Sequence, residues 1–434
     1  MKSLWTESVN FKNFKTLSGD IKTDVLIVGG GIAGILCAYM LKKSGVKCVL
    51  IEADRILGGV TGYTTAKITL QHGINFYKII NKYGVDDARL YLKANQEALD
   101  TYVKMCDEID CDFKIQDAVV YSTSNIKEIE HEAAAYSKIG LKYDFCDKVP
   151  MPIAIDGALR IKNQAQFNPI KFCLSLIDDL TIYENTKATN LFDGGIITNR
   201  GKIFADKIII ATHFPIFNKY GGYFLKMYQH RSYVIALENA ELPDAMYVDA
   251  DIKGLSFREY NGNLLLGGGS HRTGKKGGNW QELRSFAQKH YGQSREVAFW
   301  ATQDCMTLDD IAYIGQYSKK IPNVYVATGF NKWGMTSAMV SAKLLTDMIC
   351  GKRNDYEKVF SPQRSILHPQ LAINGAESVI NLITPTVPRC SHLGCALKYN
   401  KAEHSWDCPC HGSRFTKEGK LIENPATADK HLNN

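Results

Sequence analysis

Six side chains that can ligate a metal ion lie close together near the C-terminus of this 434-residue chain. Four of them form a C-x-H motif (residues 390–392) and, after 15 intervening residues, a C-x-x-H motif (residues 408–411). Thiolates and imidazoles ligate both iron–sulfur clusters and zinc. The other eight of the 12 cysteines stand singly among apolar neighbours, which is typical of reduced, buried thiols in the cytosol. The six side chains are Cys390, His392, Cys395, Cys408, Cys410 and His411.

The spacing of the two motifs resembles that of the Rieske family, whose cluster has two thiolates on one iron and two imidazoles on the other. This resemblance implies a disulfide between Cys395 and Cys410. A structural Cys₂His₂ zinc site is the alternative, although zinc motifs usually begin with two closely spaced cysteines. The cluster ligands implied by the resemblance are Cys390, His392, Cys408 and His411.

Two features depart from the usual Rieske pattern. Ser413 matches the serine that supports a cluster sulfur, but Phe415 stands where high-potential members carry tyrosine, so we expect a lowered potential. Only residues 381–434 are left for the domain, fewer than a complete Rieske β-fold normally uses. We therefore expect either an abbreviated domain that is stabilised by packing against the rest of the chain or a partner, or a domain that has lost its cluster.

A second candidate site lies in residues 24–34 (DVLIVGGGIAG). The apolar run predicts a buried strand, and Gly29, Gly31 and Gly34 predict a tight turn that admits a pyrophosphate to a helix N-terminus. A second predicted strand ends at Glu52, where an acid can bind ribose hydroxyls. This order of elements predicts a dinucleotide site, with a glycine turn that binds nothing as the alternative.

Two later segments favour FAD over NAD. Residues 207–213 (KIIIATH) predict a last strand beside the nucleotide. Residues 323–329 (NVYVATG) predict a strand, followed by a helix whose N-terminus could face the electron-rich edge of a flavin. Because the sequence has no second strand, glycine turn and helix in succession, we expect no separate NAD(P)H domain.

Over residues 21–351 the chain resembles the FAD-dependent oxidoreductases of the D-amino acid oxidase and glycine oxidase type. The resemblance is carried by the glycine turn and by residues 58–67 (GGVTGYTTAK), 211–215 (ATHFP) and 327–336 (ATGFNKWGMT). Ordinary loop capping is the alternative role for the threonines. The residues that the resemblance places at FAD are Gly29, Gly31, Ile32, Ala33, Gly34, Glu52, Ala53, Thr61, Thr64, Thr65, Thr212, Gly329, Met335 and Thr336.

Three side chains are candidates for the substrate site. Arg258 precedes a predicted turn and strand, where it could meet an anionic substrate. His271 and Trp333 lie close in sequence to segments expected at the flavin. Each also has a structural alternative, because arginines beside hairpins are usually solvated or ion-paired and tryptophans often only pack.

The resemblance implies an α/β, Rossmann-like FAD-binding domain with a substrate domain, as in the two-domain D-amino acid oxidase fold, and a small all-β Rieske-type domain. The substrate domain would contain a helical stretch at residues 75–110 and a β-rich block at residues 228–269 that covers one flavin face. The expected segments are 1–20 (N-terminal segment), 21–75, 165–215 and 322–352 (FAD-binding domain), 76–164 and 216–321 (substrate domain), 353–380 (linker) and 381–434 (Rieske domain).

The expected function is a dehydrogenase or oxidase that removes a hydride from a carbon bearing an amine, with FAD and a [2Fe–2S] cluster exchanging electrons. One alternative is an electron-transfer adaptor that takes electrons in at the cluster, and another is a flavoprotein with a structural zinc module. The expected partners are a small-molecule substrate and an acidic electron carrier such as a ferredoxin, since the formal charge is +7.

The composition argues against several other classes. No block of like charges suggests a nucleic-acid-binding tail. No apolar run approaches the roughly 20 residues that cross a bilayer, so we expect no membrane span. Residues 1–20 lack the basic and apolar regions of a signal peptide, and we therefore expect a cytoplasmic protein.

Overall fold

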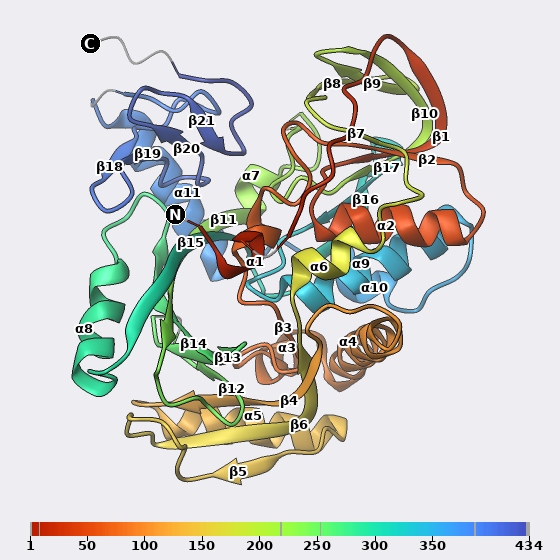
Figure 1. Cartoon of the computed structure of the whole chain (residues 1–434). Coiled ribbons are helices and arrows are strands. Elements are labelled where there is room, and N and C mark those ends of the chain that lie inside the picture. Colours follow the sequence, from red (N-terminus) through yellow and green to blue (C-terminus); the bar gives the residue numbers. More distant parts are fainter. Residues whose placement is uncertain (1, 8, 218, 252, 386–387, 431–434) are drawn as a thin grey trace.

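The computed structural model describes residues 2–7, 9–217, 219–251, 253–385 and 388–430, and this part of the chain forms three β-sheets (Figure 1). The first sheet has the strand order β16-β17-β10-β1-β2-β7, with β9 also paired to β10 and β8 paired to β9. Strands β1, β2, β7, β10 and β17 run parallel. Their bounds are β1 (Ile21–Val28), β2 (Cys48–Ile51), β7 (Ile182–Tyr183), β8 (Ala188–Phe192), β9 (Gly195–Thr198), β10 (Gly201–Ile210), β16 (Tyr313–Ser318) and β17 (Ile321–Thr328).

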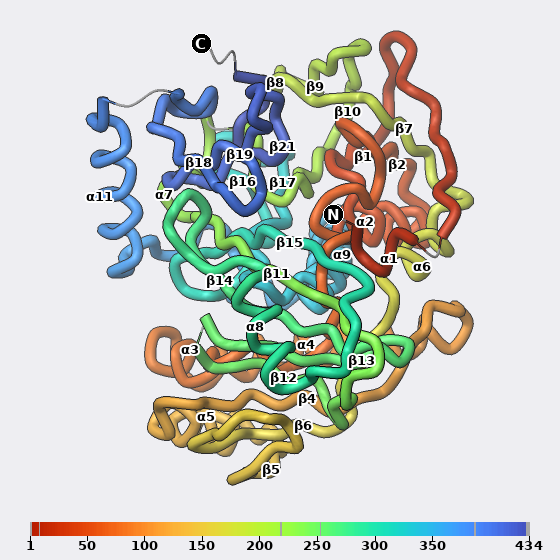
Figure 2. The backbone as a smooth tube through the Cα atoms, turned by 60° about the vertical axis from the view of Figure 1, so that its left-hand side comes forward, coloured from red at the N-terminus to blue at the C-terminus, as the bar shows by residue number. Residues whose placement is uncertain are grey.

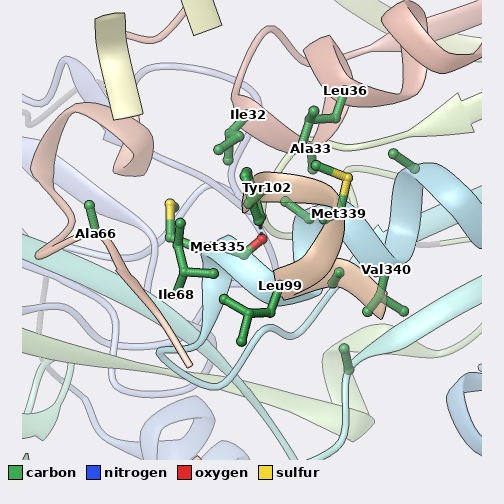
Figure 3. Packing of buried hydrophobic residues seen from close by; sticks show 14 of the residues in the cluster. Ile32, Ala33, Leu36, Ala66, Ile68, Leu99, Tyr102, Met335, Met339 and Val340 are labelled. Carbon is green, nitrogen blue, oxygen red and sulfur yellow. Dashed lines mark hydrogen bonds between the residues drawn. The ribbon is translucent and has the colours of Figure 1, made fainter. Parts of the chain in front are cut away.

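Both faces of this sheet are buried, as expected of a parallel sheet with apolar strands. Alternate residues of β1 face opposite cores, with Ile27 in one and Leu26 in the other. The core of Ile27 is completed by α2 (Ile32–Lys43), α4 (Val85–Cys106) and α9 (Gly334–Ile349). Figure 3 shows this packing, in which the Tyr102 hydroxyl of α4 donates a hydrogen bond of 2.9 Å to the Met335 carbonyl of α9.

The second sheet has the order β15-β11-β14-β13-β12-β4-β6-β3, with β5 beside β6. Its helices include α5 (Ile126–Ile139) and α8 (Trp280–His290). The helical stretch expected at residues 75–110 is two helices, α3 (Phe76–Tyr83) and α4, because Gly84 between them has φ +90°. The strands are β3 (Lys67–Ile68), β4 (Lys114–Ser122), β5 (Asp144–Cys146), β6 (Gly157–Gln166), β11 (Met227–Glu238), β12 (Met246–Asp249), β13 (Ser256–Tyr260), β14 (Asn263–Arg272) and β15 (Arg295–Thr307).

Strands β11 and β15 form a long antiparallel ribbon at one edge of the second sheet. Ser232 lies opposite Thr302, and Arg231 lies opposite Gln303. Because successive side chains point to opposite faces of a strand, these two pairs lie on opposite faces of the ribbon.

The third sheet is a four-stranded antiparallel meander near the C-terminus, consisting of β18 (Lys398–Asn400), β19 (Ser405–Asp407), β20 (Arg414–Thr416) and β21 (Leu421–Glu423). Figures 1 and 2 both place it beside the β11/β15 ribbon. Five short helices are α1 (Leu4–Glu7), η1 (Val60–Tyr63), α6 (Pro169–Leu174), α7 (Tyr223–Lys226) and α10 (Glu357–Phe360). A longer helix, α11 (Pro369–Ile383), precedes the third sheet.

Two expected boundaries differ from the structure. Strand β16 pairs with β17 across a short hairpin and so belongs to the first sheet, whereas residues 313–318 were expected in the substrate domain. The region expected as a linker, residues 353–380, contains α10 and most of α11. In the described residues, no helix combines the length and apolar character needed to cross a bilayer.

Candidate active site and cluster site

The glycine turn after β1 is packed too closely for side chains at two of its glycines. A Cβ at Gly29, whose φ is +114°, would meet the carbonyl of Ala211, and a Cβ at Gly34 would meet the carbonyl of Gly29. Gly31 is the N-cap of α2 and has no side chain of its own that could cap the helix. The missing side chain leaves room for an anion at the helix N-terminus, which fits the pyrophosphate of a dinucleotide.

The acid and threonine expected beside this turn are engaged with its backbone. Glu52 accepts hydrogen bonds from two backbone N–H groups, at 2.7 and 3.1 Å, and its burial raises the pKa of the carboxyl. The Thr61 hydroxyl accepts a 3.1 Å hydrogen bond from the backbone N–H of Ile32, so it has the capping role that was the alternative. Ala33 is buried in the first turn of α2, and Ala53 is exposed next to Glu52.

A cavity of about 230 Å³ lies between the segments expected at the flavin and the β11/β15 ribbon. Its ribbon side carries Ser232 and Thr302, whose buried hydroxyls have no hydrogen-bond partner among the described residues. Buried hydroxyls are rarely left unpaired, so these groups fit polar atoms of a ligand. The expected FAD and substrate residues that line the cavity are Thr64, Thr65, Trp333 and Met335.

The cavity also contains an acid and a base that the sequence analysis missed, Asp304 and Lys332. Burial raises the pKa of Asp304 to about 6, although nearby Lys332 opposes the shift. The Lys332 ammonium donates a 2.7 Å hydrogen bond to the Ser270 hydroxyl. Lys332 has φ +73°, an uncommon conformation for a residue other than glycine that often marks functional sites. Asp304 stands between Gln303 and Cys305 in β15, and this local sequence gives no signal of the site.

A buried histidine, also missed, positions two of the expected residues. His72 Nε2 lies 3.0 Å from the Thr336 hydroxyl, and the His72 ring stacks on Trp333 with 5.0 Å between centroids. Burial lowers the pKa of His72 to about 3, so the ring is neutral at physiological pH. His72 thus fixes the Trp333 side chain that lines the cavity.

Arg258 was expected to meet an anionic substrate, and the structure shows a structural role. The side chain is fully buried, and its guanidinium donates hydrogen bonds to the carbonyl oxygens of Thr65 and, at 3.1 Å, Phe167. It also packs over the Trp5 ring. His271 lies outside the described lining of the cavity, with its ring stacked on Tyr233.

Two further residues expected at FAD follow strands of the first sheet and contact the second and third sheets. The Thr212 hydroxyl donates a 2.8 Å hydrogen bond to the Phe214 carbonyl, and the Thr212 carbonyl accepts one of 2.6 Å from Asn424 near the third sheet. Gly329 has φ +69°, and a Cβ there would meet the Thr307 side chain.

The cysteines and histidines of the two C-terminal motifs come together next to the third sheet. The His392 and His411 rings lie 5.0 Å apart, and three of their nitrogens are buried without hydrogen-bond partners in the described structure. The neighbouring Cys408 thiol, with smaller contributions that include the Ser413 hydroxyl, lowers the pKa of Cys390 to about 7. Paired thiols beside unpartnered imidazoles fit a mixed cysteine and histidine metal cluster.

Cys395 and Cys410 are joined in a disulfide, as the resemblance implied. The disulfide ties together the two loops that carry the predicted ligands. Phe415 is fully buried and belongs to the same apolar cluster as the motif cysteines.

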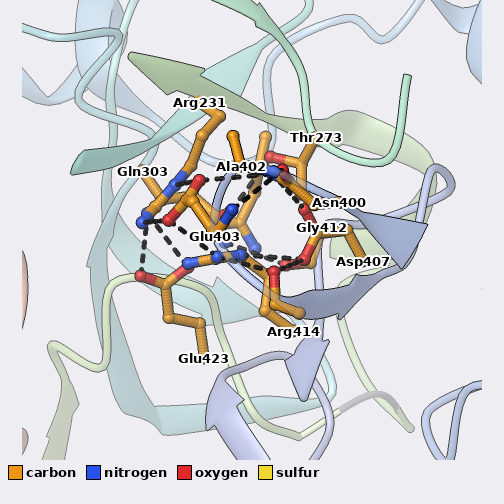
Figure 4. Close-up of polar contacts among 12 residues, drawn as sticks. Arg231, Thr273, Gln303, Asn400, Ala402, Glu403, Asp407, Gly412, Arg414 and Glu423 are labelled. Atoms are coloured by element: carbon orange, nitrogen blue, oxygen red, sulfur yellow. Dashed lines mark hydrogen bonds and ion pairs between the residues drawn. The ribbon is translucent and has the colours of Figure 1, made fainter. Parts of the chain in front are cut away.

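The cluster loops are held on the face of the ribbon opposite the cavity. The Gln229 amide donates to the His411 carbonyl at 2.8 Å, and the Gln303 amide donates to the Gly412 carbonyl at 2.9 Å. Arg231 forms ion pairs with Glu403 and Glu423 (Figure 4). One ribbon therefore separates the cavity from the cluster loops.

An aromatic ring in the turn that follows strand β10 packs against the same imidazoles. The Phe214 centroid lies 6.5 Å from the ring centroids of both His392 and His411. Phe214 follows β10 by four residues, in the same turn as Thr212. The cluster histidines thus face the FAD-binding sheet.

Comparison with known proteins identifies a family for each of the two parts of the chain. The chain matches the family model of FAD dependent oxidoreductases over residues 24–348 and that of the Rieske [2Fe-2S] domain over residues 381–432. YhfW of Bacillus subtilis (strain 168), named as a Rieske iron–sulfur protein, is 36% identical, with 98% of this chain and 96% of YhfW covered.

Two solved structures share the fold of the larger part. Glycine oxidase from Geobacillus kaustophilus has a TM-score of 0.68 at 17% identity, covering 79% of this chain and 99% of its own. L-proline dehydrogenase from P. horikoshii has a TM-score of 0.66 at 17% identity, covering 80% and 98%. The chain is therefore a member of the FAD-dependent oxidoreductase family, with FAD as cofactor, and its C-terminal segment is a Rieske domain that binds a [2Fe–2S] cluster.

Proposed function

We propose that this enzyme oxidises the C–N bond of a small amine or amino-acid-like substrate and passes the electrons to its own Rieske cluster. When bound, FAD accepts a hydride and the cluster carries single electrons. The observation that carries the proposal is the shared β11/β15 ribbon, which has the cavity on one face and the cluster loops on the other. A single layer of backbone and side chains then separates the two sites.

The turn that contains Thr212 and Phe214 supports an internal electron route. Thr212 is proposed to lie at the flavin, and the Phe214 ring packs against both proposed histidine ligands. The residues proposed to hold the cluster are Cys390, His392, Cys408 and His411. The loops that carry these ligands form hydrogen bonds with buried side chains of the rest of the enzyme. This contact favours electron transfer from FAD to the cluster of the same chain over transfer to another protein.

A buried ion pair holds the Rieske domain against the rest of the enzyme. Arg231 and Glu403 are both buried, and the Arg231 Nε donates a 2.9 Å hydrogen bond to Glu403 Oε1. Within the Rieske domain, Arg414 holds Glu403 in position by pairing with its other oxygen at 2.8 Å and with Asp407 at 3.0 Å. Removing one member of such a buried pair typically costs about 3–5 kcal/mol. We therefore propose a fixed distance between the two redox sites.

The cavity supports an amino compound as substrate. Asp304 offers a carboxylate that can bind a substrate ammonium, and the unpartnered Ser232 and Thr302 hydroxyls can orient a neighbouring polar group. Burial raises the pKa of Asp304, and the nearby Lys332 ammonium opposes this rise by stabilising the carboxylate form. The two solved structures described above are named for amino acids, glycine and L-proline.

The proposed site of action is the cytoplasm, and the proposed acceptor beyond the cluster is an acidic electron carrier such as a ferredoxin. The formal charge of +7 supports attraction of such a carrier.

Anaerobic stopped-flow mixing with a panel of small amines and amino acids, followed by freeze-quench EPR, tests this function. We expect the flavin to bleach first and the [2Fe–2S] EPR signal to appear afterwards in the same chain. If no amino compound bleaches the flavin, the substrate assignment is wrong. If the flavin bleaches while the cluster stays oxidised, internal transfer is wrong.

A further inference from the structure

Helix α11 packs with its polar residues inward and its apolar residues outward, the reverse of an ordinary surface helix. Asn374, Glu377 and Asn381 are only 3%, 9% and 3% exposed. Figure 2 shows the helix at the edge of the molecule, next to the Rieske domain. The exposed apolar residues of the helix are Ile373 (55%), Val379 (57%), Ile380 (56%), Leu382 (46%) and Ile383 (74%).

The buried polar face is bonded to the rest of the chain, which fixes the rotation of the helix. The Asn374 side-chain oxygen accepts a 2.9 Å hydrogen bond from Arg272, and Glu377 pairs with Lys275 at 2.6 Å. The Asn381 carbonyl accepts a 2.9 Å hydrogen bond from the Ala396 backbone of the Rieske domain. Turning the apolar side chains inward would break all three contacts.

The apolar surface continues beyond the helix. Leu367 before it is 81% exposed, and Leu225 of α7, which contacts α11, is 41% exposed. Leu393 is 40% exposed, in a loop that Arg389 ties to the end of α11 by donating hydrogen bonds of 2.9 Å to the Leu382 and Gly394 carbonyls. Large exposed apolar side chains gathered around one helix are typical of an interaction site.

We propose that this surface, the α11 face, docks on the surface of a lipid bilayer that contains anionic lipids. The α11 face comprises Leu225, Leu367, Ile373, Val379, Ile380, Leu382, Ile383 and Leu393. Every one of these side chains is aliphatic. Helices that lie in the membrane interface bury such side chains at the boundary between headgroups and acyl chains.

Charge around the helix fits anionic headgroups. Glu377 is the one acidic residue within α11, and Lys275 neutralises it. Lys276 follows in the same loop, and Arg389 lies at the C-terminal end of the helix. The formal charge of the whole chain, +7, adds a general attraction to anionic lipid headgroups.

A second copy of the chain is a weaker candidate for the occupant. A helix of 15 residues is only about 22 Å long, and one of its faces falls short of the roughly 800 Å² per partner that stable interfaces bury. The cores of protein interfaces are also enriched in aromatic residues, methionine and arginine, which the α11 face lacks.

Co-sedimentation of the holoenzyme with vesicles tests the proposal independently of the substrate. We expect binding to vesicles that contain phosphatidylglycerol and weaker binding to pure phosphatidylcholine. The double variant Ile380→Glu, Ile383→Glu should bind at least about tenfold more weakly, because two apolar side chains no longer enter the lipid. Ile115→Glu is the matched control, because Ile115 is 46% exposed on β4.

The flavin absorbance and the cluster EPR signal should be unchanged in both variants, which excludes misfolding. Equal sedimentation of the double variant and the holoenzyme would overturn the proposal. Failure of the holoenzyme to bind either vesicle would overturn it as well. A dimer seen by light scattering that the double variant abolishes, without any vesicle binding, would assign the α11 face to a second copy.

Discussion

Arg231 of strand β11 and Glu403 of the Rieske domain form a buried ion pair in which the Arg231 Nε donates to Glu403 Oε1 at 2.9 Å. Neither side chain is more than 3% exposed. The pair joins the strand that lines the cavity to the domain that binds the cluster. We therefore expect its removal to weaken the docking of the Rieske domain without loss of FAD or of the cluster.

Arg231→Ala should destabilise the docked Rieske domain by about 3–5 kcal/mol, because Glu403 is left buried with fewer compensating charges. Urea unfolding measures the loss, and slower cluster reduction after flavin bleaching reports the loosened docking. Arg295→Ala is the matched control, since Arg295 also pairs with a glutamate of β11 but is largely exposed. Equal destabilisation by both changes would contradict the assigned role of Arg231.

The docking should also weaken in acid. Burial alone disfavours a charged Glu403, but Arg231 and Arg414 outweigh it and lower the pKa to about 2 from an ordinary value of 4.5. A depressed acid pKa contributes stability that is present above the unfolded value and is lost as pH falls. We expect stability to fall between about pH 4.5 and 2, and Glu403→Gln to flatten this part of the profile measured by urea unfolding.

Asp304→Asn should lower kcat/KM for amines and leave reduction of the flavin by dithionite unchanged. Burial raises the pKa of Asp304 to about 6, so its carboxylate form is gained as pH rises through that value. Amine turnover should therefore rise with an apparent pKa near 6, and the step should vanish in the variant. An unchanged pH profile would exclude Asp304 from substrate binding.

Arg258→Met should lower stability without raising KM. The change leaves the buried Phe167 carbonyl and the half-buried Thr65 carbonyl without this donor, at a cost of about 1–3 kcal/mol for the buried group. Thermal unfolding and steady-state kinetics separate the two effects. A large rise in KM with unchanged stability would restore the substrate role first expected for this arginine.

Phe415→Tyr should raise the reduction potential of the cluster. Phe415 is buried among the motif cysteines, and a hydroxyl placed there can donate a hydrogen bond to a ligand sulfur, which raises the potential. Redox titration followed by EPR measures the change. Phe415→Leu serves as the control, because it adds no donor and should not raise the potential.

The sequence alone predicts those structural features that depend on short, local patterns of residues. The strand, glycine turn and helix around Gly29 and Gly34 form as predicted, and the disulfide between Cys395 and Cys410 is present. The role of Arg258 could not be predicted, because its partners Thr65 and Phe167 are 193 and 91 residues away in the chain. Asp304 and Lys332 were missed because their proximity depends on a fold contact that no local pattern encodes.

The β11/β15 ribbon also constrains how this protein can change. Side chains alternate with a period of two, so adding or deleting one residue in β11 would exchange its faces. Arg231 would then point into the cavity, while Ser232 would point toward the cluster loops. Either site can therefore be adjusted by substitution at alternate positions of β11, whereas a change in the length of this strand would alter the cavity lining and the contacts of the cluster loops together.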